Sequence, residues 1–155
     1  MKFLLSALLV FALAAPAHAA GDEDKAAATQ ALIDYFNAVI TLDTQRVVRY
    51  CHEPFTFVST GLARSLVTRA DLDSWLKPGF AALKERGYAR SEWPQLNVKL
   101  LSNGVAIASA LIVRYKTDGQ EMERVGATYL LRKTDDGWKV AVLAAHDASN
   151  VPKLD

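Results

Sequence analysis

Three turn signals divide the second half of the chain, and they constrain its fold more than any other feature. Asn103-Gly104, Asp118-Gly119 and Asp135-Asp136-Gly137 favour tight β-hairpin turns, because these residues tolerate the positive φ angles that such turns need. The segments that they separate are rich in apolar residues and lie near positions 90–101, 105–116, 121–133 and 138–146. We therefore expect a four-stranded antiparallel meander.

The first half has helical periodicity instead. A helix is expected from about Lys25 to Thr41, since its apolar residues recur at helical spacing. Asp43 is placed to cap a short second helix that Pro54 ends, and residues 55–59 are expected to form a short strand.

A third helix is expected to begin at Thr68, where Thr68 and Asp71 resemble a capping box. Pro78 predicts a kink or a split in it, and Gly87 is a natural stop.

Residues 1–19 have the pattern of a secretory signal peptide. Lys2 supplies one positive charge, an apolar run follows from Leu4 to Ala15, and Ala17-His18-Ala19 has the small-x-small form of a cleavage site. The run is too short to span a membrane, and no cysteine at the cleavage point offers a lipid anchor. We expect a periplasmic or secreted protein cleaved after Ala19. Its expected parts are a flexible segment at 20–24, one domain at 25–147 and a tail at 148–155.

The charge and motif content exclude several classes of function. Without Lys2 the mature chain carries 17 basic and 17 acidic residues. This balance leaves no excess of positive charge that would indicate binding to nucleic acid or to an anionic membrane. The three histidines lack metal-ligand spacing, and no glycine-rich phosphate loop is present, so we expect neither metal nor cofactor. Cys51 is alone, and it is either a buried structural residue or a thiol that bridges two chains.

The segments at 105–115 and 140–145 are apolar on both faces. A sheet buried on both sides needs helices over one face and a second cover over the other. A partner subunit is the simplest such cover, so we expect a homodimer.

The order of these elements resembles the nuclear transport factor 2-like superfamily, which includes polyketide cyclases and steroid isomerases. Residues 31–38 resemble that family's first helix, residues 55–59 its first strand and residues 137–140 the start of its last strand. The likeness covers about residues 25–147. It implies an α+β fold in which a curved, cone-shaped antiparallel sheet wraps around N-terminal helices.

The steroid-isomerase branch of that family uses a carboxylate base, a tyrosine and a protonated acid. Tyr35 stands where the branch keeps its tyrosine, but the base position falls on Ser59, whose hydroxyl accepts no proton near neutral pH. The segment 126–133, where the second acid is expected, has no Asp or Glu. The resemblance therefore does not extend to isomerase chemistry.

Counting residues from the hairpin turns predicts which side chains share a face of the sheet. Arg114 is expected opposite Glu123, and Ala108 opposite Tyr129. Arg114 could bind an anionic ligand, although its pairing with Glu123 explains it without one.

The same count places Tyr129, Val142, Ala144 and His146 on the face of Ala106, Ala108 and Ala110, where small side chains leave room for a ligand, a helix or a dimer partner. It also places Gln95, Asn97 and Lys99 there, which is unexpected for an interior face. Three explanations stay open: an odd-numbered turn, a bulge that shifts the register, or an alanine face that points outward.

The expected ligand-binding residues are Tyr35, Phe57, Trp75, Tyr129 and His146. The first hypothesis is an exported domain that binds a small hydrophobic or aromatic molecule without catalysis. The second is a cofactor-free lyase, isomerase or hydrolase that uses His146 as general base with Tyr35, which requires both on one cavity. The third is a homodimeric module without a cavity.

Overall fold

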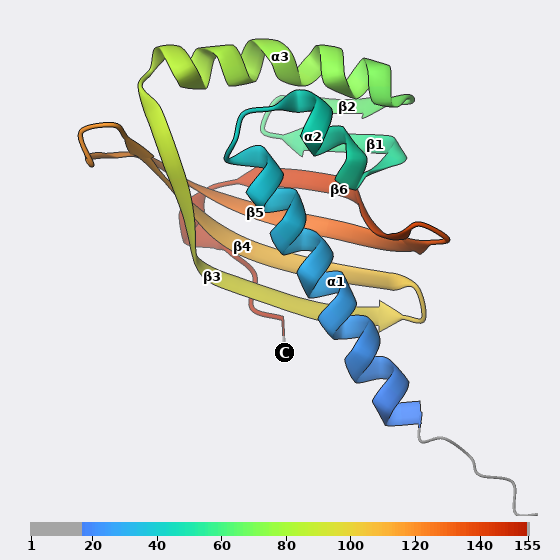
Figure 1. Cartoon of the computed structure of the whole chain (residues 1–155). Helices are drawn as coiled ribbons and strands as arrows, with labels where there is room; N and C mark the ends of the chain where they lie inside the picture. The colour runs from blue at the N-terminus through green and yellow to red at the C-terminus, as the bar shows by residue number, and fades with distance from the viewer. Residues whose placement is uncertain (1–16, 155) are drawn as a thin grey trace, which may run out of the picture.

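The computed structural model describes residues 17–154, so most of the expected signal peptide lies outside the described residues. One curved, unclosed six-stranded sheet has the strand order β2-β1-β6-β5-β4-β3, and α1 and α3 lie over one of its faces (Figure 1). This is the α+β architecture that the sequence predicts. The elements are α1 (Ala17–Val39), α2 (Thr44–Val47), the 3-10 turn η1 (Val48–Tyr50), β1 (Cys51–Ser59), β2 (Leu62–Leu66), α3 (Arg69–Glu85), β3 (Tyr88–Ser102), β4 (Val105–Lys116), β5 (Glu121–Thr134), β6 (Gly137–His146) and the 3-10 turn η2 (Ala148–Asn150).

Side-chain caps set the starts of the two later helices, as expected. The Asp43 carboxylate accepts a hydrogen bond from the backbone N–H of Arg46 at 3.2 Å. At α3 the N–H of Asp71 donates to Thr68 Oγ1 at 3.1 Å, and the N–H of Thr68 donates to Asp71 Oδ2 at 3.0 Å, which completes the capping box. Of the two outcomes expected at Pro78, a kink or a split, the split is wrong, because α3 continues through this residue. The carbonyl that Pro78 leaves without a donor belongs to Ser74, which is exposed and can bond to water.

The N-terminal helix begins earlier than the sequence predicts. Residues 20–24, expected as a flexible segment, are part of α1, which starts at Ala17. Ala20 and Glu23 in this stretch favour a helix, whereas Gly21 does not. Asp24 accepts a hydrogen bond from Lys133 Nζ of β5 at 2.5 Å. This ion pair joins the start of the helix to the sheet.

Two strand boundaries also differ from expectation. β1 begins at Cys51 rather than residue 55, and Pro54 lies inside it instead of ending a helix. The pairing of β1 with β6 is interrupted between Cys51 and Thr56, which is where a proline without an N–H is tolerated. The edge strand β2, mostly exposed, lacks the apolar alternation that would have predicted it.

Two β-bulges decide which side chains face the helices. Between β3 and β4 the register shifts at Leu101, so Leu96, Val98 and Leu100, rather than the polar residues between them, lie beside the alanines of β4. Of the three explanations left open, the bulge is correct. The alanine face is the inner face, and Ala106, Ala108 and Ala110 are completely buried.

The second bulge lies between β5 and β6. Leu131 pairs with Val140, but Leu130 pairs with Val142, so Ala141 is left without an opposite residue. This extra residue brings Leu143 opposite Tyr129 and moves Val142, Ala144 and His146 to the outer face.

The C-terminal segment covers part of the outer face. The Ser109 hydroxyl, fully buried, donates to the carbonyl of Pro152 at 2.6 Å. At the end of β6 the His146 ring donates through Nδ1 to the carbonyl of Asp147 at 3.0 Å and accepts through Nε2 from the Thr128 hydroxyl at 3.1 Å. The expected tail is therefore packed against the sheet.

Among the described residues, none of the helices combines the length and the apolar character needed to cross a bilayer.

The contact of the C-terminal segment with Gly126 generates a stability prediction. A Cβ at Gly126 would lie 2.4 Å from His146 Nδ1 and 2.6 Å from the Asp147 carbonyl oxygen, so Gly126→Ala must displace backbone. We expect a loss of about 1–3 kcal/mol in the free energy of unfolding, measured in urea. Gly79→Ala is the control, because nothing lies within 4 Å of its Cβ and alanine favours a helix interior. Equal stabilities of the two variants would contradict the packing of this segment.

Candidate functional site

A cavity of about 350 Å³ lies between α1 and the inner face of the sheet. Its walls come from α1, β1, the end of α3 and all four long strands. The lining residues are Tyr35, Phe36, Val39, Leu42, Phe57, Leu83, Tyr88, Ser91, Ile112, Arg114, Glu123, Val125, Ala127, Tyr129, Leu143 and Ala145. Most of them are apolar, which is typical of a small-molecule site.

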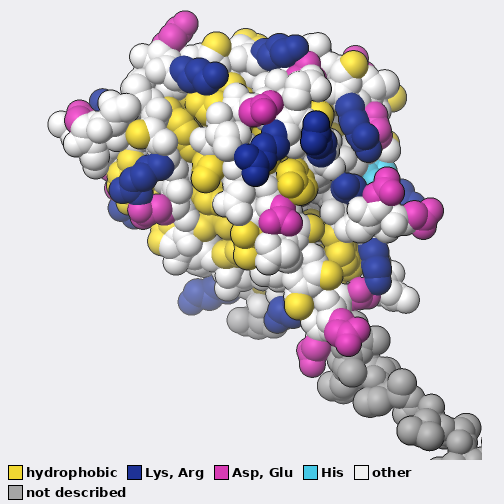
Figure 2. Space-filling view, viewed as in Figure 1, with side chains coloured by type: hydrophobic (Ala, Val, Ile, Leu, Met, Phe, Trp, Pro, Cys, Tyr) yellow, Lys and Arg dark blue, Asp and Glu magenta, His cyan; other side chains and the backbone are white. Residues whose placement is uncertain are grey.

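Small side chains on the strands leave this space open. Ala110, Ala127 and Ala145 lie side by side on β4, β5 and β6, where larger residues would fill the gap beneath α1. Figure 2 shows that hydrophobic side chains also reach the surface on the face that carries α1, between scattered basic and acidic groups.

Two tyrosines place hydroxyl groups in the cavity wall. Tyr35 of α1 and Tyr129 of β5 are 6% and 2% exposed, and their rings meet edge to face at 6.0 Å between centroids. No described residue forms a hydrogen bond with either hydroxyl. Burial raises the pKa of both phenols well above the ordinary value, so both stay protonated and can donate.

One carboxylate and two guanidinium groups form an ion cluster at one end of the cavity. Glu123 accepts from Arg114, its partner across β4 and β5, and from Arg86 Nη2 at 2.7 Å at the end of α3. Partial burial raises the pKa of Glu123, but the hydrogen bonds from Arg86 and Arg114 outweigh it and hold the pKa below its ordinary value. The expected opposition of Arg114 and Glu123 is confirmed.

A second hydroxyl pair lies next to this cluster. Tyr88 and Ser91 of β3 form a side-chain hydrogen bond of 2.8 Å, and Ser91 is the strand partner of Arg114. Burial raises the pKa of Tyr88, against smaller opposing effects of Ser91 and Arg114.

A smaller cavity of about 140 Å³ adjoins the first and shares Tyr35, Phe57 and Arg114 with it. Trp75 of α3 lines this second space, and its ring lies 4.9 Å from that of Phe57 between centroids. The Cys51 thiol also lines it.

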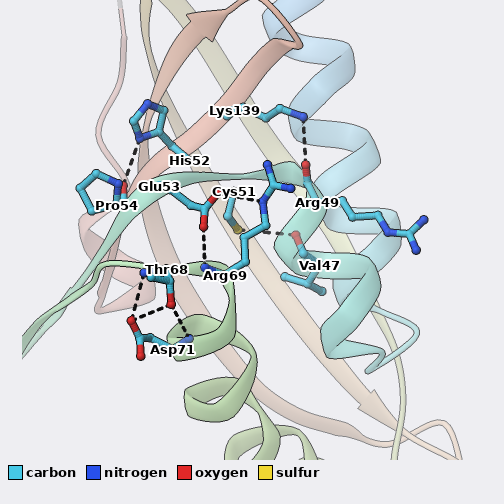
Figure 3. Close-up of polar contacts among 10 residues, drawn as sticks. All are labelled: Val47, Arg49, Cys51, His52, Glu53, Pro54, Thr68, Arg69, Asp71 and Lys139. Carbon is cyan, nitrogen blue, oxygen red and sulfur yellow. Dashed lines mark hydrogen bonds and ion pairs between the residues drawn. The ribbon is translucent and has the colours of Figure 1, made fainter.

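Figure 3 shows Cys51 on β1, where its thiol donates to the Val47 carbonyl at 3.6 Å. Burial raises the pKa of this thiol to about 12, despite the nearby positive charges of Lys139 and Arg69. Cys51 is therefore a buried thiol.

Four of the five expected site residues meet at these two cavities. Tyr35, Phe57 and Tyr129 line the larger one, and Trp75 lines the smaller. His146 does not join them, because the bulge at Ala141 places it on the outer face against Thr128. The expected face shared by Tyr129 and His146 is wrong for this reason. Ser59, at the end of β1, lines neither cavity.

The sequence did not predict Tyr88 and Ser91 as cavity residues, nor Arg86 as a member of the ion cluster. Arg86 follows α3 and Tyr88 begins β3, so both depend on the angle at which the chain leaves the helix. Ser91 faces inward only because the β3–β4 register shifts again between Glu92 and Gln95. A residue count from the turn carries no signal for that shift.

The described residues contain no group of three or more His, Cys, Asp and Glu side chains that could hold a metal ion.

The family described as NTF2-like protein (DUF6841) matches residues 22–148. This chain belongs to that NTF2-like family. No curated protein matches it. Among solved structures, an NTF2-like protein with a cystatin-like fold from Novosphingobium aromaticivorans is similar at a TM-score of 0.71, with 15% identity over 86% of this chain and 88% of that one.

Two further structures share the fold of this NTF2-like chain. A candidate aromatic ring hydroxylase from the same organism has a TM-score of 0.64 and 20% identity, covering 84% of this chain and 93% of that one. A candidate dehydratase of the NTF2-like family from Streptomyces avermitilis has a TM-score of 0.64 and 16% identity, covering 86% of this chain and 99% of that one. These likenesses show the fold.

The environment of Cys51 predicts a thiol that resists alkylation. With a pKa of about 12, its thiolate fraction at about pH 8 is roughly a thousandfold smaller than that of a free thiol. We expect native protein to react with iodoacetamide at least a hundredfold more slowly than protein unfolded in urea, as followed by mass spectrometry. The unfolded chain is the internal control, since Cys51 is its only cysteine. A native rate within tenfold of the unfolded rate would contradict the buried position.

Proposed function

We propose that this NTF2-like protein is an exported binding protein for a small, largely apolar molecule, which it holds in the cavity beneath α1. The observation that carries the proposal is the pair of tyrosine side chains in the cavity wall, whose hydroxyls form no hydrogen bond with a described residue. A hydroxyl in the wall of a largely apolar cavity can donate to a ligand oxygen, and such a directed hydrogen bond contributes to affinity and fixes the orientation of the ligand. Tyr35 and Tyr129 both present such hydroxyls.

The cavity volume supports a ligand of one or two rings. Small-molecule sites usually enclose about 300–1,000 Å³, and a cavity of about 150 Å³ can hold benzene. At about 350 Å³, with a further 140 Å³ beside Trp75, the space suits a bicyclic compound.

The geometry gives no support to the catalytic hypothesis that pairs His146 with Tyr35. That hypothesis needs both side chains on one cavity, whereas His146 lies on the opposite face of the sheet. The hypothesis of a module without a cavity is also disfavoured by the space beneath α1.

Export and dimerisation remain part of the proposal. The small-x-small site at Ala17–Ala19 supports cleavage after Ala19. Val58, Val105 and Leu130, which are 36–38% exposed, support an association of two copies through their apolar surface.

The tyrosine pair predicts selective loss of ligand affinity. The probe is 2-acetylnaphthalene, whose carbonyl oxygen accepts hydrogen bonds, with binding measured by quenching of tryptophan fluorescence. We expect Tyr35→Phe and Tyr129→Phe each to weaken binding by about two- to tenfold, because one net hydrogen bond is lost. Neither variant should lower the melting temperature by more than about 2 °C, since the hydroxyls have no described partner.

Tyr115→Phe is the matched control, because Tyr115 lies outside both cavities and should leave the affinity unchanged. No measurable binding of the probe to the parent protein, or equal losses in all three variants, would reject the proposed site.

The proposed export predicts a defined mature chain. When the full sequence is expressed in a bacterium and the periplasmic fraction is purified, we expect intact-mass measurement to give a chain that begins at Ala20. Replacing Ala17 and Ala19 by Arg should block cleavage. Native mass spectrometry of the same sample tests the dimer. A cytoplasmic chain that retains Lys2 and Phe3 would overturn export, and a single-chain mass would overturn the dimer.

A further inference from the structure

One row of cross-strand neighbours in the cavity wall is polar, and the next inward-facing row is apolar. Ser91, Arg114 and Glu123 lie directly opposite one another on β3, β4 and β5. The next inward-facing row along β4 and β5 is the pair Ile112 and Val125. A molecule in the cavity therefore meets charge at one end and an apolar wall over the rest of its length.

The ion cluster at this end of the cavity carries a net positive charge. Arg86 and Arg114 both bind the single carboxylate of Glu123, which leaves one positive charge without a counter-ion in this cluster. Glu123 is the only acidic residue among the described residues that line the cavity. The side chains of Arg114 and Glu123 are 25% and 27% exposed, so this charge is less screened than one on the open surface.

We propose that the ligand is an anion, namely a compact apolar carboxylic acid whose carboxylate binds at Arg114 while its ring system occupies the apolar part of the cavity. The inference rests on the proposed function and names the ligand class of the same site. The planar guanidinium fork matches a carboxylate, and such charge-assisted hydrogen bonds are stronger than neutral ones. Ser91, beside Arg114, offers a further hydroxyl donor.

Arg114 is placed to act on the whole site. It lines both cavities, and its charge also acts on the hydroxyls of Tyr35 and Tyr129, whose pKa values it lowers against the larger effect of burial. An acid bound at Arg114 therefore lies in the space that the two tyrosines share.

Glu123 limits the affinity of this site for anions. It orients Arg114 by a direct hydrogen bond, but its own charge opposes that of an incoming carboxylate. Removing the charge at Glu123 should therefore strengthen the binding of an acid, whereas a purely structural ion pair would give the opposite result.

The test compares 2-naphthoate with 2-naphthamide, which have the same ring system and differ in charge. Binding to the mature protein is measured by calorimetry at neutral pH and low salt. We expect 2-naphthoate to bind about tenfold more tightly. If the amide binds as well as the acid or better, the inference is overturned and the proposed function stands. If neither compound binds, and 2-acetylnaphthalene does not bind either, the proposed function fails and the inference with it.

Variants assign the charge preference to Arg114. The readout is the ratio of the dissociation constants of the two probes, because a general disturbance of the cavity weakens both. Glu123→Gln should raise the preference for the acid by about three- to tenfold, and Arg114→Met should abolish it. Arg124→Met is the matched control for Arg114→Met, since Arg124 lies on the neighbouring strand β5, pairs with Glu121 and is absent from the cavity wall.

If Arg114→Met does not fold, as judged by its thermal transition, the ratio of the two dissociation constants in Glu123→Gln is the deciding measurement. An unchanged or reduced preference for the acid in Glu123→Gln would overturn the inference.

Discussion

The pairing register of β5 with its neighbours is the constraint on which the rest of the structure depends. Because successive side chains of a strand point to opposite faces, a shift of one residue exchanges the whole set that faces α1. In this chain the register brings Tyr129, Ala127 and Val125 inward and, through the bulge at Ala141, adds Leu143 and Ala145 from β6. The cavity, its hydroxyl groups and its apolar wall all follow from that alignment.

The cavity joins three different environments. Alanines leave room beneath the helix, the aromatic rings of Tyr35, Phe57 and Tyr129 form rigid walls, and a partly buried ion cluster stands at one end. Burial keeps the phenols protonated, while the two guanidinium groups keep Glu123 ionised. The site thus offers fixed donors and fixed charge, and these are the means by which a largely apolar pocket orients a ligand.

Much of this architecture can be read from the sequence, and the exceptions have physical causes. The turn signals predict the meander, and the caps at Asp43 and Thr68 predict two helix starts, because these are local effects of neighbouring residues. Arg114 opposite Glu123 follows from a short count across one regular turn. The position of His146 could not be counted correctly, because a bulge depends on packing between strands and leaves no reliable mark in the sequence. The edge strand β2 was missed for a related reason, since it buries little and shows no alternation.

The unpaired residue Ala141 also bears on how sites on this scaffold can change over time. A single-codon deletion there would close the bulge and leave the distal pairs as they are, with Val142 opposite Leu130 and Leu143 opposite Tyr129. Loss of the bulge without a deletion, so that Ala141 pairs with Leu130, would instead turn Val142, Ala144 and His146 toward the helices and Leu143 and Ala145 toward the outer face. A cavity with an imidazole in its wall would then arise without the replacement of any side chain. A change of register at a bulge is therefore a route to new pocket chemistry in this fold, and residue-by-residue alignment of distant relatives will misplace site positions wherever such a bulge has been gained or lost.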